Sequence, residues 1–278
     1  MAERPAAPWS DLGIRALSAA ILIPAVILDV WVGGVWFDLL VAVIAVLMAL
    51  EWTNLVHGRD SRQFALHGAA AMAAAFLPLH ADAGAALAVI AALGLVSILL
   101  ARAAAADGSL WRYLGVPYVG LPAMALVLLR NGSAMGVEAI IWVLVTVWAA
   151  DTLAYFAGRM IGGPKLAPVL SPKKTWAGLG GAVAGAAIAS LLFAAVAGLP
   201  GPWPLALLAA CLALVEQAGD LFKSAMKRHY GVKDSGDLIP GHGGVIDRVD
   251  GLVAVAVAAL LVGLARNGAD AGAGLLVW

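Results

Sequence analysis

The stretch from Ser224 to Asp250 is unusually polar for this chain, and apolar sequence flanks it on both sides. Only 12% of the 278 residues are charged, yet this stretch carries side chains of both signs. Carboxylates can hold a divalent cation and basic groups can hold phosphate, so the combination predicts phosphoryl chemistry at a membrane surface. Its candidates for this chemistry are Lys227, Arg228, Lys233, Asp234, Asp237, His242, Asp247, Arg248 and Asp250.

Acidic residues at helical spacings lie just before this stretch and at its C-terminal end. Asp220, Ser224 and Lys227 lie on one face if the chain is helical there, so a cation and a phosphate can be held side by side. Asp247 and Asp250 follow one helical turn apart, at the start of the last apolar run. Hard oxygen ligands favour Mg²⁺ over zinc, so one or two Mg²⁺ ions are expected.

Glycines interrupt the middle of the same stretch. Gly243 and Gly244 allow backbone N–H groups to approach a phosphate closely. His242 has three possible roles, as a catalytic base, as a hydrogen-bond donor to phosphate, or as a residue that shapes the loop. The alternative for the whole stretch is a solvated loop of mixed charge.

A second polar cluster, Ser171–Trp176, precedes another apolar run. Ser171, Lys173, Lys174 and Thr175 are its candidate substrate-binding residues. Two adjacent lysines can also bind anionic lipid or set membrane topology, and this alternative stays open. This alternative explains the two lysines but does not as readily explain the neighbouring Ser171, Pro172 and Thr175.

A third cluster lies inside an apolar run, where Asp151, Tyr155 and Gly158 share one helical face. An ionised carboxylate within a membrane costs at least ~2.5–3.5 kcal/mol, so Asp151 needs a reason to be there. It is either a substrate-site residue, together with Tyr155, or a partner for a basic residue on a neighbouring helix.

Apolar runs of membrane-spanning length must position these clusters. The sequence is 63% hydrophobic and has a mean hydropathy of +0.95, which indicates an all-α integral membrane protein. The single Cys211 excludes a disulfide within the chain. Nine spans are expected, at approximately 14–32, 35–52, 66–80, 83–101, 116–130, 137–158, 177–198, 203–219 and 251–266. The third and fifth are short enough to be partly re-entrant.

The basic residues alternate between the two sides of these nine spans. Of the 17 lysines and arginines, all but Arg130 and Arg266 fall on one side. The positive-inside rule then places the N-terminus and the loops 159–176 and 220–250 in the cytoplasm, with the C-terminus outside. We expect residues 1–115 to serve as membrane anchor and possible dimer contact, and residues 116–278 to form the catalytic region.

These motifs resemble those of the phosphatidate cytidylyltransferases, also called CDP-diacylglycerol synthases. The family signature is a Ser, then Lys-Arg, Lys-Asp, Pro-x-His-Gly-Gly and Asp-Arg-x-Asp, and this chain keeps every spacing. The matching residues are Ser224, Lys227-Arg228, Lys233-Asp234, Pro240, His242-Gly243-Gly244, Asp247-Arg248 and Asp250. The segment 171–176 and Gly219-Asp220 are also similar. The resemblance covers most of residues 148–252, whereas the N-terminal half matches only as apolar helices.

The resemblance implies a multi-pass inner-membrane enzyme that joins CTP to phosphatidic acid, giving CDP-diacylglycerol and pyrophosphate. It also implies a divalent metal held by Asp220 and Asp247, and a homodimer. Lys227 and Asp250 would complete the catalytic group. Two departures stand out, because the family usually has Glu at the positions of Ala177 and Lys223. Asp237 is a nearby acid that could compensate.

Two other classes of function remain as alternatives. A transporter for a phosphorylated metabolite would use similar charges, but near the membrane midplane and often in two repeated halves, and no repeat is visible here. Another lipid-phosphate enzyme, such as a polyprenol kinase, is the second alternative. A CDP-alcohol phosphotransferase would need an Asp-rich motif that the chain lacks. No nucleic-acid partner is expected.

Overall fold

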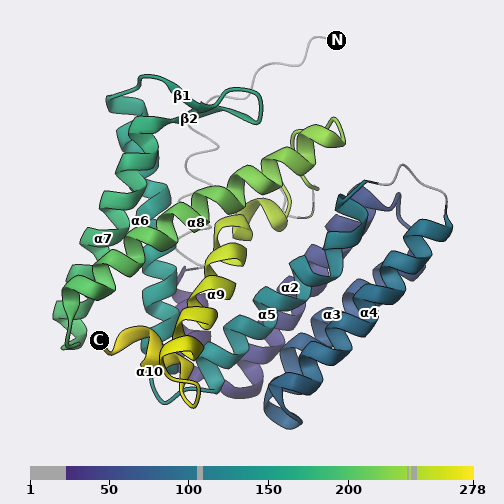
Figure 1. The fold of residues 1–278 in the computed structure, drawn as a ribbon, viewed down its shortest axis with the longest axis horizontal. Coiled ribbons are helices and arrows are strands. Elements are labelled where there is room, and N and C mark those ends of the chain that lie inside the picture. Colours follow the sequence, from purple (N-terminus) through teal and green to yellow (C-terminus); the bar gives the residue numbers. More distant parts are fainter. Residues whose placement is uncertain (1–22, 105–108, 237, 239–242) are drawn as a thin grey trace.

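The computed structural model describes residues 23–104, 109–236, 238 and 243–278. Most of them are helical (Figure 1). After a helical segment at Ile23–Val32 come α2 Gly34–Val56, α3 Ser61–His80, α4 Ala83–Ala103, α5 Trp111–Asn131, α6 Gly136–Met160, β1 Lys165–Ala167, β2 Ser171–Thr175, α7 Trp176–Ala197, α8 Pro202–His229, α9 Ile246–Arg266 and α10 Ala271–Leu276.

Seven helices in the described part of the chain are long and apolar enough to cross a membrane. They are α2, α4, α5, α6, α7, α8 and α9. The protein is therefore an all-α polytopic membrane protein, as the composition predicts. Two of the nine expected spans are not among the seven. The first is described only from residue 23, as the short helix Ile23–Val32, and the third corresponds to α3, which is helical but not among the candidate spans.

The helices form two groups that meet at α9. Helices α2 to α5 pack together, and α6 packs on α7, which packs on α8. Helix α9 contacts α5, α6 and α8, and α10 folds back against α9 (Figure 1). Because α9 touches both groups, residues at its N-terminal end are positioned by both halves of the sequence.

The polar stretch expected as a loop at 220–250 is helical at both of its ends. Helix α8 continues ten residues past the expected end of its span, to His229, and α9 begins at Ile246 instead of residue 251. Asp220, Lys223 and Lys227 therefore lie on α8, and Asp247 and Asp250 lie on α9. Helical geometry fixes the relative positions of these side chains within each helix, as the spacing of the residues predicts.

A small two-stranded antiparallel ribbon replaces most of the loop expected at 159–176. Lys165 pairs with Thr175 and Ala167 pairs with Ser171. The second strand passes directly into α7, where the hydroxyl oxygen of Thr175 accepts a hydrogen bond of 3.0 Å from the backbone N–H of Gly178. Thr175 is thus the N-cap of α7, which ties the ribbon to a membrane helix.

Candidate active site

Three carboxylates from two helices surround one buried ammonium group. The Lys223 Nζ atom lies 3.2 Å from Asp220 Oδ1 and 3.5 Å from Asp247 Oδ1. It also forms an ion pair with Asp250 Oδ2. Lys223 is only 6% exposed. We call these four residues the carboxylate cluster.

Two further lysines form ion pairs with carboxylates of the cluster. Lys174, from the ribbon, lies 2.7 Å from Asp220 Oδ2, and Lys227 lies 2.6 Å from Asp247 Oδ1. Three ammonium groups therefore face three carboxylates. Paired in this way, charges that would be costly to bury alone are tolerated beside apolar helices.

A close crossing of α8 and α9 brings the carboxylates together. A Cβ atom at Gly219 would lie 2.9 Å from the Ala254 Cβ atom and 3.1 Å from the Asp250 carbonyl oxygen. A Cβ atom at Gly251 would lie 2.8 Å from Cγ of Glu216. These distances are too short for a larger residue, so the two glycines allow the helices to approach closely.

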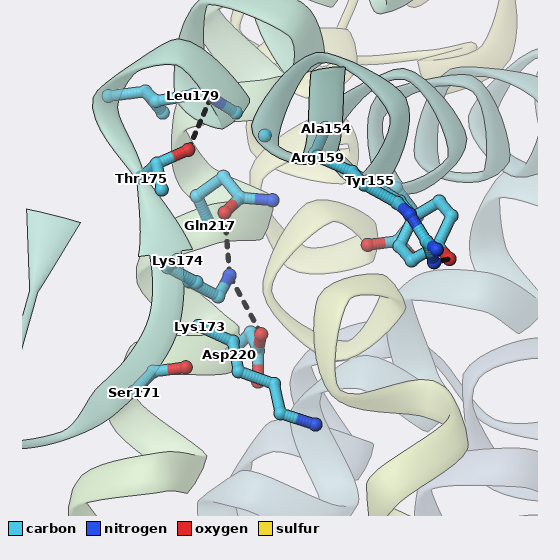
Figure 2. A pocket seen from close by; sticks show the side chains of 13 residues that line it. Ala154, Tyr155, Arg159, Ser171, Lys173, Lys174, Thr175, Leu179, Gln217 and Asp220 are labelled. Atoms are coloured by element: carbon cyan, nitrogen blue, oxygen red, sulfur yellow. Dashed lines mark hydrogen bonds and ion pairs between the residues drawn. The ribbon is translucent and has the colours of Figure 1, made fainter. Parts of the chain in front are cut away.

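A cavity of about 580 Å³ opens beside the cluster and shares Asp220 with it. Its walls come from α6, the ribbon, the start of α7, and α8 (Figure 2). Of the residues expected to bind substrate, it is lined by Asp151, Tyr155, Ser171, Lys173, Lys174 and Thr175. The structure thus brings the second and third polar clusters of the sequence to one cavity.

The adjacent lysines of the ribbon take different positions because side chains alternate along a strand. Lys174 points inward, where its Nζ atom pairs with Asp220 and donates to Gln217 Oε1 at 2.6 Å (Figure 2). Lys173 is exposed at the cavity wall. Lys174 therefore connects the cavity to the carboxylate cluster, while Lys173 lines the cavity and is open to solvent.

The α6 wall of the cavity carries a third basic side chain, in addition to Lys173 and Lys174 of the ribbon. Arg159 Nη1 donates a hydrogen bond of 2.7 Å to the Tyr155 hydroxyl (Figure 2). Arg159 lines the cavity but was not among the expected site residues. Its position at the end of the sixth apolar run was read only as a topology signal.

The segment between α8 and α9 is held by a buried carboxylate from the N-terminal half. Glu51, on α2 and 1% exposed, accepts hydrogen bonds from the backbone N–H groups of Val245 at 2.6 Å and Ile246 at 2.9 Å. Ser235 Oγ lies 3.2 Å from Glu51 Oε2 and 2.9 Å from Asp247 Oδ2. The Ser235 N–H donates to Asp247 Oδ2 at 2.8 Å. Glu51 thus positions the start of α9, where Asp247 lies.

Other expected site residues lie around this segment. Gly243 has a left-handed backbone with φ of +78°, and a Cβ atom at Gly244 would lie 2.6 Å from Glu51 Oε2. Ser224 is partly exposed on α8. Arg228, Lys233, Asp234 and Arg248 are exposed, and Arg228 Nη1 lies 3.4 Å from the Val232 carbonyl oxygen. His242, Pro240 and Asp237 lie outside the described residues.

Besides Arg159, sequence reasoning missed three residues of the site, Glu51, Gln217 and Lys223. Glu51 was counted only as part of an apolar span, although an ionisable residue within a span is by itself a signal of function. Gln217 lies between Lys174 and Glu216, donating to Glu216 Oε2 at 2.6 Å. Lys223 was noted as a departure from a family pattern, and nothing in the sequence placed it between three carboxylates.

The oxygen donors of the cluster suit a hard cation such as Mg²⁺. Each carboxylate offers about four lone-pair positions, so its present ion pairs do not exhaust it. Among the described residues, no three Asp, Glu, His or Cys side chains form a ready metal cage. Mg²⁺ is commonly bound through one or two carboxylates together with substrate phosphates, so two of these aspartates would suffice as its protein ligands.

Comparison with known proteins adds evidence independent of this geometry. The model of the cytidylyltransferase family matches residues 13–264. A phosphatidate cytidylyltransferase of Brucella abortus is 42% identical over 255 residues, covering 91% of this chain and 94% of its own length. A phosphatidate cytidylyltransferase of Bacillus subtilis is 41% identical over 139 residues, or 50% of this chain and 52% of its own length. A match over most of the sequence, with its motifs gathered at one site, shows that this chain belongs to the cytidylyltransferase family.

Proposed function

We propose that this protein transfers the cytidylyl group of CTP to phosphatidic acid, giving CDP-diacylglycerol and pyrophosphate. The relatives named phosphatidate cytidylyltransferase support the activity, since one of them matches 91% of the chain. The observation that carries the proposal is the position of Asp220. It lines the polar cavity and also belongs to the carboxylate cluster, so one residue joins a phosphate-binding cavity to an acidic centre.

The reaction is the attack of a phosphatidate oxygen on the α-phosphorus of CTP. A new P–O bond forms while the bond between the α-phosphorus and its bridging oxygen to the β-phosphorus breaks, and pyrophosphate leaves. Both substrates are polyanions, so their approach is opposed by charge. Lys173, Lys174 and Arg159 are placed to bind phosphate oxygens in the cavity and to reduce that repulsion. Phosphatidate is already a good nucleophile at neutral pH, so no strong general base is required.

Mg²⁺ is part of this proposal, with Asp220 and Asp247 as the residues that would hold it. When bound, it would neutralise phosphate charge and stabilise charge that develops on the leaving oxygen. Lys227 and Asp250 would complete the catalytic group. Ser171, Ser224, Arg228, Lys233, Asp234, His242, Gly243, Gly244 and Arg248 are proposed as further substrate-binding residues, together with Asp151, Tyr155 and Thr175.

We place the active site at the cytoplasmic face of the inner membrane, where CTP is available. The distribution of lysines and arginines supports nine spans, a cytoplasmic N-terminus and an external C-terminus. The ribbon and the C-terminal end of α8 lie toward one end of the molecule (Figure 1). A homodimer is part of the proposal, and its support is the resemblance to the family.

The direct test is an assay of purified protein in detergent with phosphatidate and CTP labelled at the α-phosphorus. We expect a labelled lipid that migrates as CDP-diacylglycerol, dependent on both substrates and on Mg²⁺. A transporter would give no labelled product, and a lipid kinase would transfer label only from CTP carrying it at the γ-phosphorus. Either result would overturn the proposed activity.

A further inference from the structure

We propose that Lys223 is a built-in cation that takes the place of one divalent metal ion in the carboxylate cluster. The inference rests on the proposed function, in which the cluster binds Mg²⁺. Its test measures the number of bound metal ions and does not depend on catalytic turnover. The wild-type cluster is therefore expected to bind one divalent cation fewer than a variant whose residue 223 is acidic or neutral.

The first argument is geometric. The Lys223 Nζ atom lies within 3.5 Å of carboxylate oxygens from Asp220 and Asp247 and also pairs with Asp250. Lys174 contacts only Asp220 within the cluster, and Lys227 contacts only Asp247. Of these three lysines, Lys223 alone reaches all three carboxylates, as a central metal ion would.

The second argument concerns charge. Three partly buried carboxylates repel one another strongly unless cations lie between them. Lys223, Lys174 and Lys227 balance these three charges without any metal. A divalent ion placed at the centre would approach a buried ammonium, and this like-charge repulsion would disfavour its binding.

The third argument is that Lys223 is not free to leave. It lies in the middle of the C-terminal part of α8, and its side chain is 8% exposed. An ammonium withdrawn from the cluster would have to be buried without partners, at high cost. Lys223 is therefore a fixed positive charge, and a divalent cation held by Asp220 and Asp247 would have to bind away from the Lys223 Nζ atom, where substrate phosphates can complete its coordination.

The experiment is a Mn²⁺ titration of the purified full-length protein followed by electron paramagnetic resonance, which counts free and bound Mn²⁺. Wild-type protein is compared with Lys223→Glu, Lys223→Met and Lys223→Arg. We expect Lys223→Glu to bind one more Mn²⁺ per chain than wild type. Lys223→Met should bind Mn²⁺ at least ~10-fold more tightly (~1.4 kcal/mol), because the variant removes the repulsion between the ammonium and the bound cation. Lys223→Arg should bind as wild type does.

Lys165→Glu is the matched control, because Lys165 is an exposed lysine on β1 outside the cluster. It makes the same change of charge and should leave the Mn²⁺ count and affinity at wild-type values. The proposal is overturned if wild type binds as many Mn²⁺ ions as Lys223→Glu and with the same affinity. If Lys223→Glu fails to fold, the Lys223→Met variant provides the test. A Mn²⁺ affinity equal to that of wild type in this variant would also overturn the proposal.

Discussion

Glu51 and Val245 are 194 positions apart in the sequence, yet the Glu51 carboxylate accepts a 2.6 Å hydrogen bond from the Val245 N–H. The same carboxylate accepts from Ile246, the first residue of α9. Free N–H groups at a helix N-terminus attract negative charge, so the position suits an acid. The N-terminal helices therefore also hold the C-terminal half in place, because Glu51 of α2 binds the start of α9, the helix that carries Asp247 and Asp250.

We expect Glu51→Ala to lower both stability and turnover. The change leaves two buried N–H groups without their acceptor, at about 1–3 kcal/mol each. For a chain of this size, 1 kcal/mol corresponds to roughly 2–4 °C in Tm. Thermal unfolding in detergent measures the shift. Glu138→Ala, a partly exposed glutamate on α6, is the control. Equal Tm values for the two variants would show that Glu51 does not hold the segment.

Asp220→Asn and Asp247→Asn should each leave a folded protein whose CTP-dependent turnover is lower by at least ~100-fold. This is the scale of losing a key electrostatic stabiliser. The measurement is the rate of labelled CDP-diacylglycerol formation at saturating substrates. Asp82→Asn is the control, because Asp82 caps α4 and asparagine is an equally good N-cap. Near wild-type turnover in both cluster variants would refute their assignment.

Lys174→Ala should mainly weaken substrate binding and raise the KM for CTP. The variant removes the ammonium that lines the cavity and pairs with Asp220. Steady-state kinetics at varied CTP concentration separates the effects on KM and kcat. Lys165→Ala, on the neighbouring strand, should change neither constant. If Lys174→Ala left every kinetic constant unchanged, the lysine pair would be explained by membrane topology or by binding to anionic lipid.

Gly219→Ala should destabilise the protein by about 1–3 kcal/mol, the usual cost of overpacking. The added methyl group would lie 3.1 Å from the Asp250 carbonyl oxygen, and the backbone there cannot move without shifting α9. Gly180→Ala is the matched control, since a Cβ atom at Gly180 meets nothing within 4 Å. Thermal unfolding should show a lower Tm for the first variant only. A tolerated Gly219→Ala would mean that the helix crossing is not tight.

A reporter active only in the cytoplasm should be inactive when fused after Trp278. The reason is the odd number of spans expected from the distribution of basic residues, which places the C-terminus outside. The same reporter inserted between Gly162 and Gly163 should be active. An active reporter at Trp278 would contradict the nine-span topology and would leave the site geometry unaffected.

The sequence predicts the helices and the acidic residues of the site better than their partners. Apolar runs identify most membrane helices, and local helical spacing places Asp220 and Lys227 on one side of α8. The central position of Lys223 depends on how α8 crosses α9, which no local pattern encodes. The partners of Glu51 could not be predicted for the same reason, since they lie almost two hundred positions away in the sequence. The ribbon was missed because its strands are only three and five residues long, and β2 contains two lysines and a proline, which are depleted in strands.

The passage from β2 into α7 contains no spacer, because β2 ends at Thr175 and α7 begins at Trp176. Lys174 is therefore separated by a single residue from α7, one of the candidate membrane-spanning helices. Helix α7 packs along α8, which carries Asp220. The packing of these two helices therefore also sets the separation of Lys174 and Asp220, which form a 2.7 Å ion pair at the cavity.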